Sequence, residues 1–217
     1  MKVFRHKNEK YSVYFLSASF IAGTVLHLIP DTLPLVLKLT ELYLLLINVL
    51  IFSFGVFDNQ RNIHAFVFWT VFASLIVFLI EVTGVETGII FGSFWYGDSM
   101  PTKMGGVPLI VALNWTMLIL AVYGFFSGLV KNKIIRIFAT GIFTVIIDFL
   151  VEPVATYFDY WNWENNSVPL QNYLVWFVIS VLFSSVFVIM KLHARSIVFK
   201  FFIFWQVVFL IIMNFVK

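Results

Sequence analysis

Four carboxylates lie at the ends of two long apolar segments. Asp148 and Glu152 are four residues apart, so on a helix they share one face. Two carboxylates this close in an apolar environment cannot both ionise easily, and one of them should keep its proton near neutral pH. A protonated carboxyl group in an apolar pocket is a general acid. Glu81 and Glu86 end the earlier segment, and we expect at least one of them to face the Asp148–Glu152 pair.

A purely structural role for these acids is the alternative. Each could cap a helix or hydrogen-bond to Asn114 or Asn172 and so link two helices. A charged group at membrane depth, however, costs about 2.5–3.5 kcal/mol on insertion scales, so such groups usually serve a function. Because the arrangement occurs twice, a catalytic site is the stronger interpretation. The predicted catalytic residues are Asp148, Glu152, Glu81 and Glu86.

Each of the two segments is followed by an aromatic loop and then by one short pattern. The pattern Val-Pro-Leu-x-x-x-Leu-x-Trp occupies residues 107–115 and again 168–176. A weaker copy at 33–41 has Glu41 in place of the tryptophan. Proline suits the first turn of a helix, so each copy predicts a helix that starts there. We therefore predict three antiparallel helical hairpins followed by a final helix.

Aromatic and amide side chains surround the predicted site. Trp and Tyr near the ends of membrane spans usually form an interfacial belt. The other interpretation is a lid over a hydrophobic ligand, with aromatic faces that stabilise a cation. Both interpretations can hold together. The predicted substrate-binding residues are Tyr96, Trp95, Trp161 and Trp163 in the loops, and Asn114, Trp115, Asn172 and Trp176 near the helix starts.

The composition is that of an integral membrane protein. Of the 217 residues, 61% are hydrophobic and 12% are charged, whereas about 25% are charged in soluble domains. Segments of about 20 apolar residues predict membrane-spanning helices. Seven such segments predict an all-α membrane protein with one polytopic domain over residues 1–217: 11–29, 33–56, 64–83, 107–127, 134–152, 169–190 and 197–216. The chain has no cysteine, which excludes disulfides, thiolate metal sites and cysteine nucleophiles.

The distribution of Lys and Arg predicts the orientation of these spans. One side collects Lys2, Arg5, Lys7, Lys10, Arg61, Lys131, Lys133, Arg136, Lys191, Arg195 and Lys200, and the other has Lys38, Lys103 and Lys217. We therefore expect a cytoplasmic N-terminus in the cell (inner) membrane, with the carboxylates near the extracytoplasmic leaflet. The basic run at 1–10 is interpreted as a cytoplasmic tail rather than a signal peptide.

Several other functions fit the residues less well. A retinal protein needs a lysine in the middle of its last span, but Lys200 lies at the entrance of that span. The four histidines are scattered, which disfavours a histidine metal site. A metal site built from the four carboxylates is a minor alternative. A prenyltransferase is disfavoured because the chain has no diphosphate-binding motif.

Three segments resemble the membrane carotenoid biosynthesis proteins, a family that includes cofactor-independent carotenoid hydratases. The segments run from Glu81 to Gly97, from Gly106 to Trp115, and from Asp148 to Trp176, so that the resemblance is strongest over 80–177. Their motifs include Asp148-x-x-x-Glu152-Pro153, where the family often has Asp at the position of Glu152.

The resemblance implies addition of water to the terminal C1=C2 bond of an acyclic carotenoid end. The substrate would be lycopene, γ-carotene or a bacterioruberin precursor, taken from the lipid bilayer. An acid would protonate C2, and water would capture the tertiary cation at C1, with no redox cofactor or metal required. We expect Asp148 or Glu152 to be the proton donor, and Glu81 or Glu86 to position water or stabilise the cation.

Two rival functions start from the same residues. A membrane lycopene cyclase would begin with the same protonation, but an internal alkene would capture the cation. A non-enzymatic carotenoid-binding or transport protein would use the carboxylates for structure or proton coupling. The polar residues Asn114 and Asn172 near the carboxylates favour a site that admits water.

Overall fold

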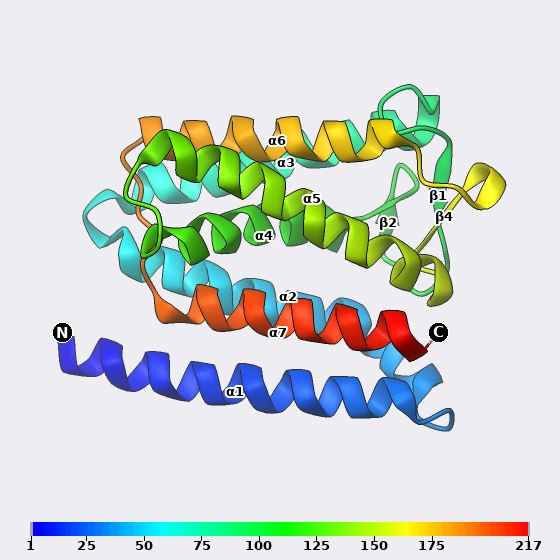
Figure 1. The fold of residues 1–217 in the computed structure, drawn as a ribbon, viewed down its shortest axis with the longest axis horizontal. Helices are drawn as coiled ribbons and strands as arrows, with labels where there is room; N and C mark the ends of the chain where they lie inside the picture. The colour runs from blue at the N-terminus through cyan, green and yellow to red at the C-terminus, as the bar shows by residue number, and fades with distance from the viewer. Residues whose placement is uncertain (1, 217) are drawn as a thin grey trace.

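In the computed structural model, which describes residues 2–216 and side chains from Lys7 onward, seven α-helices form an antiparallel bundle (Figure 1). The helices are α1 Lys2–Leu28, α2 Leu33–Asp58, α3 Ile63–Thr87, α4 Leu109–Ser127, α5 Lys133–Tyr157, α6 Leu170–Ile189 and α7 Ile197–Val216. Each contains a stretch long and apolar enough to cross a membrane. The prediction of an all-α, multi-pass membrane protein is therefore confirmed. The charges of Lys2, Arg5 and Lys217, which contributed to the predicted orientation, lie outside the described side chains.

Helix α4 lies in the middle of the bundle and is the most buried span. It packs against α2, α3, α5 and α7. Helices α5 and α6 pack closely along one another, and Gly141 faces Phe177 and Val181 of α6 at their interface. Helix α1 packs mainly on α7 rather than on α2. Of the three predicted hairpins, the first is thus the most open.

Prolines mark the starts of three helices, as predicted. Pro108 and Pro169 directly precede α4 and α6 and have extended backbone conformations, while Pro34 lies inside the first turn of α2. A proline lacks the N–H that would be unpaired at a helix start, so these positions carry little cost. The three starts lie at the same end of the bundle, opposite the N-terminus (Figure 1).

The ends of the two carboxylate-bearing helices differ from the prediction. Helix α3 continues past residue 83 to Thr87 and ends at Gly88, whose left-handed φ of 66° suits glycine. The span predicted at 134–152 ends at Glu152, and Pro153 favours such an end because a proline disfavours helix at the preceding residue. That prediction was wrong, since α5 runs through Pro153 to Tyr157. Proline removes one helical hydrogen bond, and packing of the next turn, which buries Val154 and Ala155, compensates for it.

The aromatic loops contain four short strands that were not predicted. Strand β1 (Phe94–Tyr96) pairs antiparallel with β4 (Trp161–Trp163), with Tyr96 opposite Trp161 and Phe94 opposite Trp163. Strands β2 (Lys103–Met104) and β3 (Val107–Pro108) form a small hairpin. Short 3-10 helices cover Gln60–Asn62 and Glu164–Asn166. Because alternate residues of a strand point to opposite faces, Tyr96, Trp161, Phe94 and Trp163 share one face and Trp95 lies on the other.

Candidate active site

Three of the four predicted carboxylates come together inside the bundle. Asp148 and Glu152 lie on α5 and Glu81 lies on α3, and no more than 3% of any of these side chains is exposed. Glu86 is exposed in the last turn of α3 and does not join them. The continuous helix explains this difference, because residues five positions apart on an α-helix point in different directions.

Glu152 is held by three N–H groups. Trp161 and Trp163 each donate an indole N–H to its Oε2, at 2.9 and 2.7 Å. Asn172 donates from Nδ2 to Oε1 at 3.1 Å. The two indoles come from alternate residues of strand β4, and the amide comes from the first turn of α6. Three donors on one buried carboxyl group form an environment that suits its anionic form.

Asp148 lies one helical turn behind Glu152 and shares its amide partner. Asn172 Nδ2 also donates to Asp148 Oδ2, at 2.9 Å. The other oxygen, Oδ1, is buried and has no hydrogen-bond partner among the residues that the structure describes. Asn172 therefore links α5 to α6, as the structural alternative expected of it.

Glu81 has a different partner. The Tyr96 hydroxyl of strand β1 donates to Glu81 Oε2 at 2.9 Å. Burial raises the pKa of the Tyr96 hydroxyl well above its usual range. Tyr96 therefore stays protonated and acts as a donor. The β1–β4 pair thus supplies hydrogen-bond donors to carboxyl groups on two different helices.

The carboxyl groups of Glu81 and Glu152 border a small chamber of about 20 Å³. This is enough room for about one water molecule. Tyr96 and Asn172 add polar groups to its wall, so a water molecule there would find several hydrogen-bond partners. The remaining wall is aromatic and consists of Phe91, Phe94, Trp115, Trp161, Trp163 and Trp176.

A much larger cavity of about 480 Å³ lies beside this chamber. Side chains of α1, α2, α4, α5 and α7 line it, and most of them are apolar. Leu39 and Leu42 of α2 and Ala22 of α1 line the cavity and are exposed on the outside of the bundle. The cavity therefore opens between α1 and α2 toward the surface that faces lipid. Among the described side chains, Trp115 and Trp161 line both the cavity and the chamber.

The predicted substrate-binding residues divide into three groups. The first group lines the chamber and consists of Tyr96, Trp115, Trp161, Trp163, Asn172 and Trp176. Within it, Trp115 and Trp176 stack with their ring centres 3.9 Å apart. Asn114 lines the large cavity and is not among the hydrogen-bond partners of the three carboxylates. Trp95 is 52% exposed, on the outer face of β1, away from the chamber.

Sequence reasoning missed most of the cavity. Phe20 and His27 of α1 and Phe202 and Phe209 of α7 line it, although nothing in their spacing distinguishes them from ordinary core residues. Their role depends on the packing of α1 against α7, which joins the two ends of the sequence. Phe91 and Phe94 could have been found, because they belong to the aromatic loop that follows Glu86.

Comparison with known proteins shows the family of this chain. The sequence model of the family described as carotenoid biosynthesis protein matches residues 39–217. The chain belongs to this family. The resemblance seen in the sequence is thereby confirmed, and the protein has a role in carotenoid biosynthesis.

A curated relative of this carotenoid biosynthesis protein is the bisanhydrobacterioruberin hydratase of Haloarcula japonica. The two are 31% identical over 105 residues, which are 45% of this chain and 36% of the relative. The match thus spans about a third of the length of that hydratase. No solved structure matches the chain.

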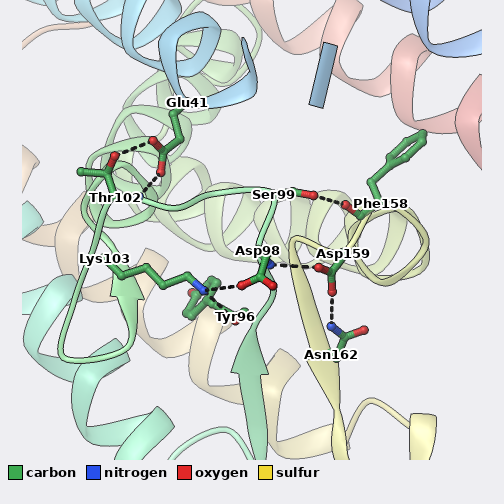
Figure 2. A network of polar contacts seen from close by, with 9 residues as sticks. All are labelled: Glu41, Tyr96, Asp98, Ser99, Thr102, Lys103, Phe158, Asp159 and Asn162. Carbon is green, nitrogen blue, oxygen red and sulfur yellow. Dashed lines mark hydrogen bonds and ion pairs between the residues drawn. The ribbon is translucent and has the colours of Figure 1, made fainter. Parts of the chain in front are cut away.

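In this carotenoid biosynthesis protein, a polar network holds the loop at 97–106 (Figure 2). Glu41 of α2 accepts hydrogen bonds from the backbone N–H of Thr102 at 2.9 Å and from its hydroxyl at 2.7 Å. Asp159 Oδ2 accepts the N–H of Asp98 at 2.9 Å. Glu41 therefore holds this loop, and Lys103 Nζ, which donates to the backbone oxygen of Tyr96 at 3.0 Å, connects the loop to β1.

Proposed function

We propose that this protein hydrates the terminal C1=C2 double bond of an acyclic carotenoid end. One observation carries the proposal. A chamber with room for about one water molecule, bordered by the carboxyl groups of Glu81 and Glu152, adjoins a large apolar cavity that opens toward lipid. The name of the Haloarcula japonica relative supports hydration as the reaction.

The opening between α1 and α2 supports a substrate that enters from the bilayer. A polyene has no polar group to interact with water, and the walls of the cavity are mostly apolar. The bias of Lys and Arg supports a cytoplasmic N-terminus. In the inner cell membrane this orientation places the chamber near the extracytoplasmic leaflet, so water enters from the outer surface.

Hydrogen bonding supports a division of labour between the two carboxyl groups. Glu152 accepts three N–H donors, so it is the anion that stabilises positive charge. Among the described residues, Glu81 accepts one hydrogen bond, from the hydroxyl of Tyr96, so it is the proton donor. This assignment differs from our expectation that Asp148 or Glu152 gives the proton. Asp148 lines neither space, and its role is to fix Asn172.

The reaction then takes two steps. Glu81 transfers its proton to C2 of the terminal alkene, whose π electrons form the new C–H bond and leave a tertiary cation at C1. The Glu152 carboxylate and the face of Trp115 stabilise this cation. Water in the chamber attacks C1 and gives a proton to Glu152. That proton returns to Glu81 through the shared chamber, so the enzyme is restored and one water molecule is consumed.

Pigment analysis tests the proposed reaction. The protein is expressed in bacteria that accumulate lycopene or γ-carotene, and the carotenoids are analysed by mass spectrometry. A product that is heavier by one water molecule supports hydration. A product of unchanged mass but different retention indicates a cyclase instead. If several acyclic carotenoids all remain unchanged, both enzymatic functions are wrong and a binding or transport role is left.

Substitution of the carboxyl groups tests the site. Glu81→Gln and Glu152→Gln should each lower the hydrated product at least about tenfold, since general acid–base catalysis typically contributes 10²-fold or more. Glu86→Gln is the matched control and should leave product near the wild-type amount, because Glu86 is exposed outside the chamber. Protein amounts in the membrane are compared by immunoblot. Equal losses for all three variants, or none, would contradict the assignment.

A further inference from the structure

The boundary between the large cavity and the chamber consists of two tryptophans. Trp115 and Trp161 are the described side chains that line both spaces. A polyene end that moves along the cavity must therefore pass one of these indoles before it can reach Glu81 or Glu152. Which of the two is able to move follows from how each is held.

Trp115 is fixed in an aromatic stack. Its ring lies 3.9 Å from that of Trp176, and the Trp176 ring in turn stacks on Phe91 with centres 5.7 Å apart. Its side chain is 5% exposed, and its backbone belongs to the central helix α4. Moving it would disturb this entire stack.

Trp161 is held more loosely. It is half-buried on the short strand β4, and its ring meets Tyr96 edge-on at 6.2 Å. Its indole N–H donates to Glu152 at 2.9 Å. Trp163 donates to the same oxygen, but it is 3% exposed, packs on Phe94 with ring centres 5.1 Å apart, and lines the chamber without reaching the cavity. Trp161 thus combines a place on the boundary with a single polar tether.

We propose that Trp161 is a positioning residue that forms the movable wall between the substrate cavity and the carboxylate chamber. With its indole in place, the chamber is limited to about one water molecule, and Glu152 keeps all three donors. When a polyene end displaces the indole, the alkene gains access to Glu81, and Glu152 gives up one hydrogen bond as the cation forms beside it. The effect of this wall on the reaction rests on the proposed function, but access to the chamber can be measured without any turnover.

A hydrophobic carbodiimide measures this access directly. Dicyclohexylcarbodiimide reaches carboxyl groups from an apolar phase and leaves a stable adduct on protonated ones. The full-length protein in lipid nanodiscs is treated with the reagent, and labelling of Glu81 and Glu152 is followed over time by peptide mass spectrometry. Trp161→Ala, which removes the indole, should raise the labelling rate about tenfold over that of Trp161→Phe, which keeps a ring as a wall.

The Trp163→Phe variant is the matched control. It removes an N–H donor from the same Glu152 oxygen, as Trp161→Phe does, but leaves the wall intact. The two Phe variants should therefore label at similar rates. Thermal unfolding of each variant in the same nanodiscs shows whether the protein is folded. A tryptophan that only stabilises the fold would change the melting temperature and leave the Ala-to-Phe ratio of labelling rates at one.

The possible outcomes separate the wall from the reaction. Equal labelling of folded Trp161→Ala and Trp161→Phe overturns the movable wall, whatever the pigment analysis gives. Faster labelling of Trp161→Ala supports the wall even if the wild-type protein hydrates no carotenoid, in which case the proposed function alone fails. If Trp161→Ala does not fold, Trp161→Leu takes the place of the Ala variant in the comparison, because it removes the indole with a smaller loss of volume.

Discussion

Glu81 and Glu152 are the same amino acid in the same chamber, yet their surroundings differ in a way that chemistry can use. Indole and amide N–H groups converge on Glu152, whereas a phenol hydroxyl meets Glu81. An acid–base pair needs one group that releases a proton and another that accepts one. Strand β4 and helix α6 create that difference, and the two side chains themselves do not.

Tyr96→Phe tests the partner of the proposed acid. Loss of the hydroxyl leaves Glu81 without its donor among the described residues and free to rotate. Loss of a hydrogen-bond partner costs about 1–3 kcal/mol, and the same loss in the positioning of the acid would lower the amount of hydrated carotenoid about 5- to 150-fold. Tyr157→Phe is the control, because this tyrosine is 58% exposed on the outside of the bundle. At equal protein amounts, pigment analysis should show a loss of hydrated carotenoid in bacteria with Tyr96→Phe and none in bacteria with Tyr157→Phe. A similar fall in both would contradict the role of Tyr96.

At the scale of elements, the β1–β4 pair joins the ends of α3 and α5 and carries donors to both. The sequence predicted the spans, their order and the convergence of acids at one end, because apolar length and carboxylate spacing are local signals. It did not predict this strand pair, since each strand has three residues and its partner lies far away in the chain. The same limitation led to the wrong end for α5, where tertiary packing of Val154 and Ala155 prevailed over the local effect of Pro153.

Gly97→Ala should disrupt this element. A Cβ at Gly97 would lie 2.2 Å from Asp159 Oδ1 and 2.3 Å from the Asp159 backbone oxygen, so the backbone of the β4 loop must shift. Overpacking of this kind costs about 1–3 kcal/mol, and we expect a lower melting temperature in detergent together with less product. Gly23→Ala is the control, since a Cβ there meets none of the described atoms within 4 Å. A melting temperature that falls equally in both variants would count against this account of β1 and β4.

At the scale of the whole molecule, the position of α1 determines how the bundle opens. Because α1 packs on α7, the space between α1 and α2 becomes the opening of the large cavity. In Figure 1, α1 lies at the edge of the bundle next to α7. The contact joins the first and last helices of the chain, and no local pattern in the sequence predicts such a contact. The cavity was therefore the largest part of the site that the sequence left undetermined.

Gly23→Trp tests this opening. The indole would enter the cavity at a position on α1 where the structure leaves open space among the described atoms. We expect at least about a tenfold loss of hydrated product, because access to a buried site controls turnover. The melting temperature should not change. Val25→Trp is the matched control, since Val25 is 50% exposed and does not line the cavity. Equal activity of the two variants would indicate that substrate enters by another route.

The family match begins at residue 39, inside α2, and so excludes α1. The three buried carboxylates and their donors all lie within the matched part, whereas α1 supplies Ser19, Phe20, Ala22, Gly23, Leu26 and His27 to the cavity. Helix α1 thus forms one wall of the cavity, and helices of the matched part form the other walls. Under the proposed function, an exchange of α1 alone should leave the carboxylate chamber in place and change the shape of the cavity only at its α1 wall. Helix α1 is therefore the place to begin in redirecting this scaffold toward other hydrocarbons.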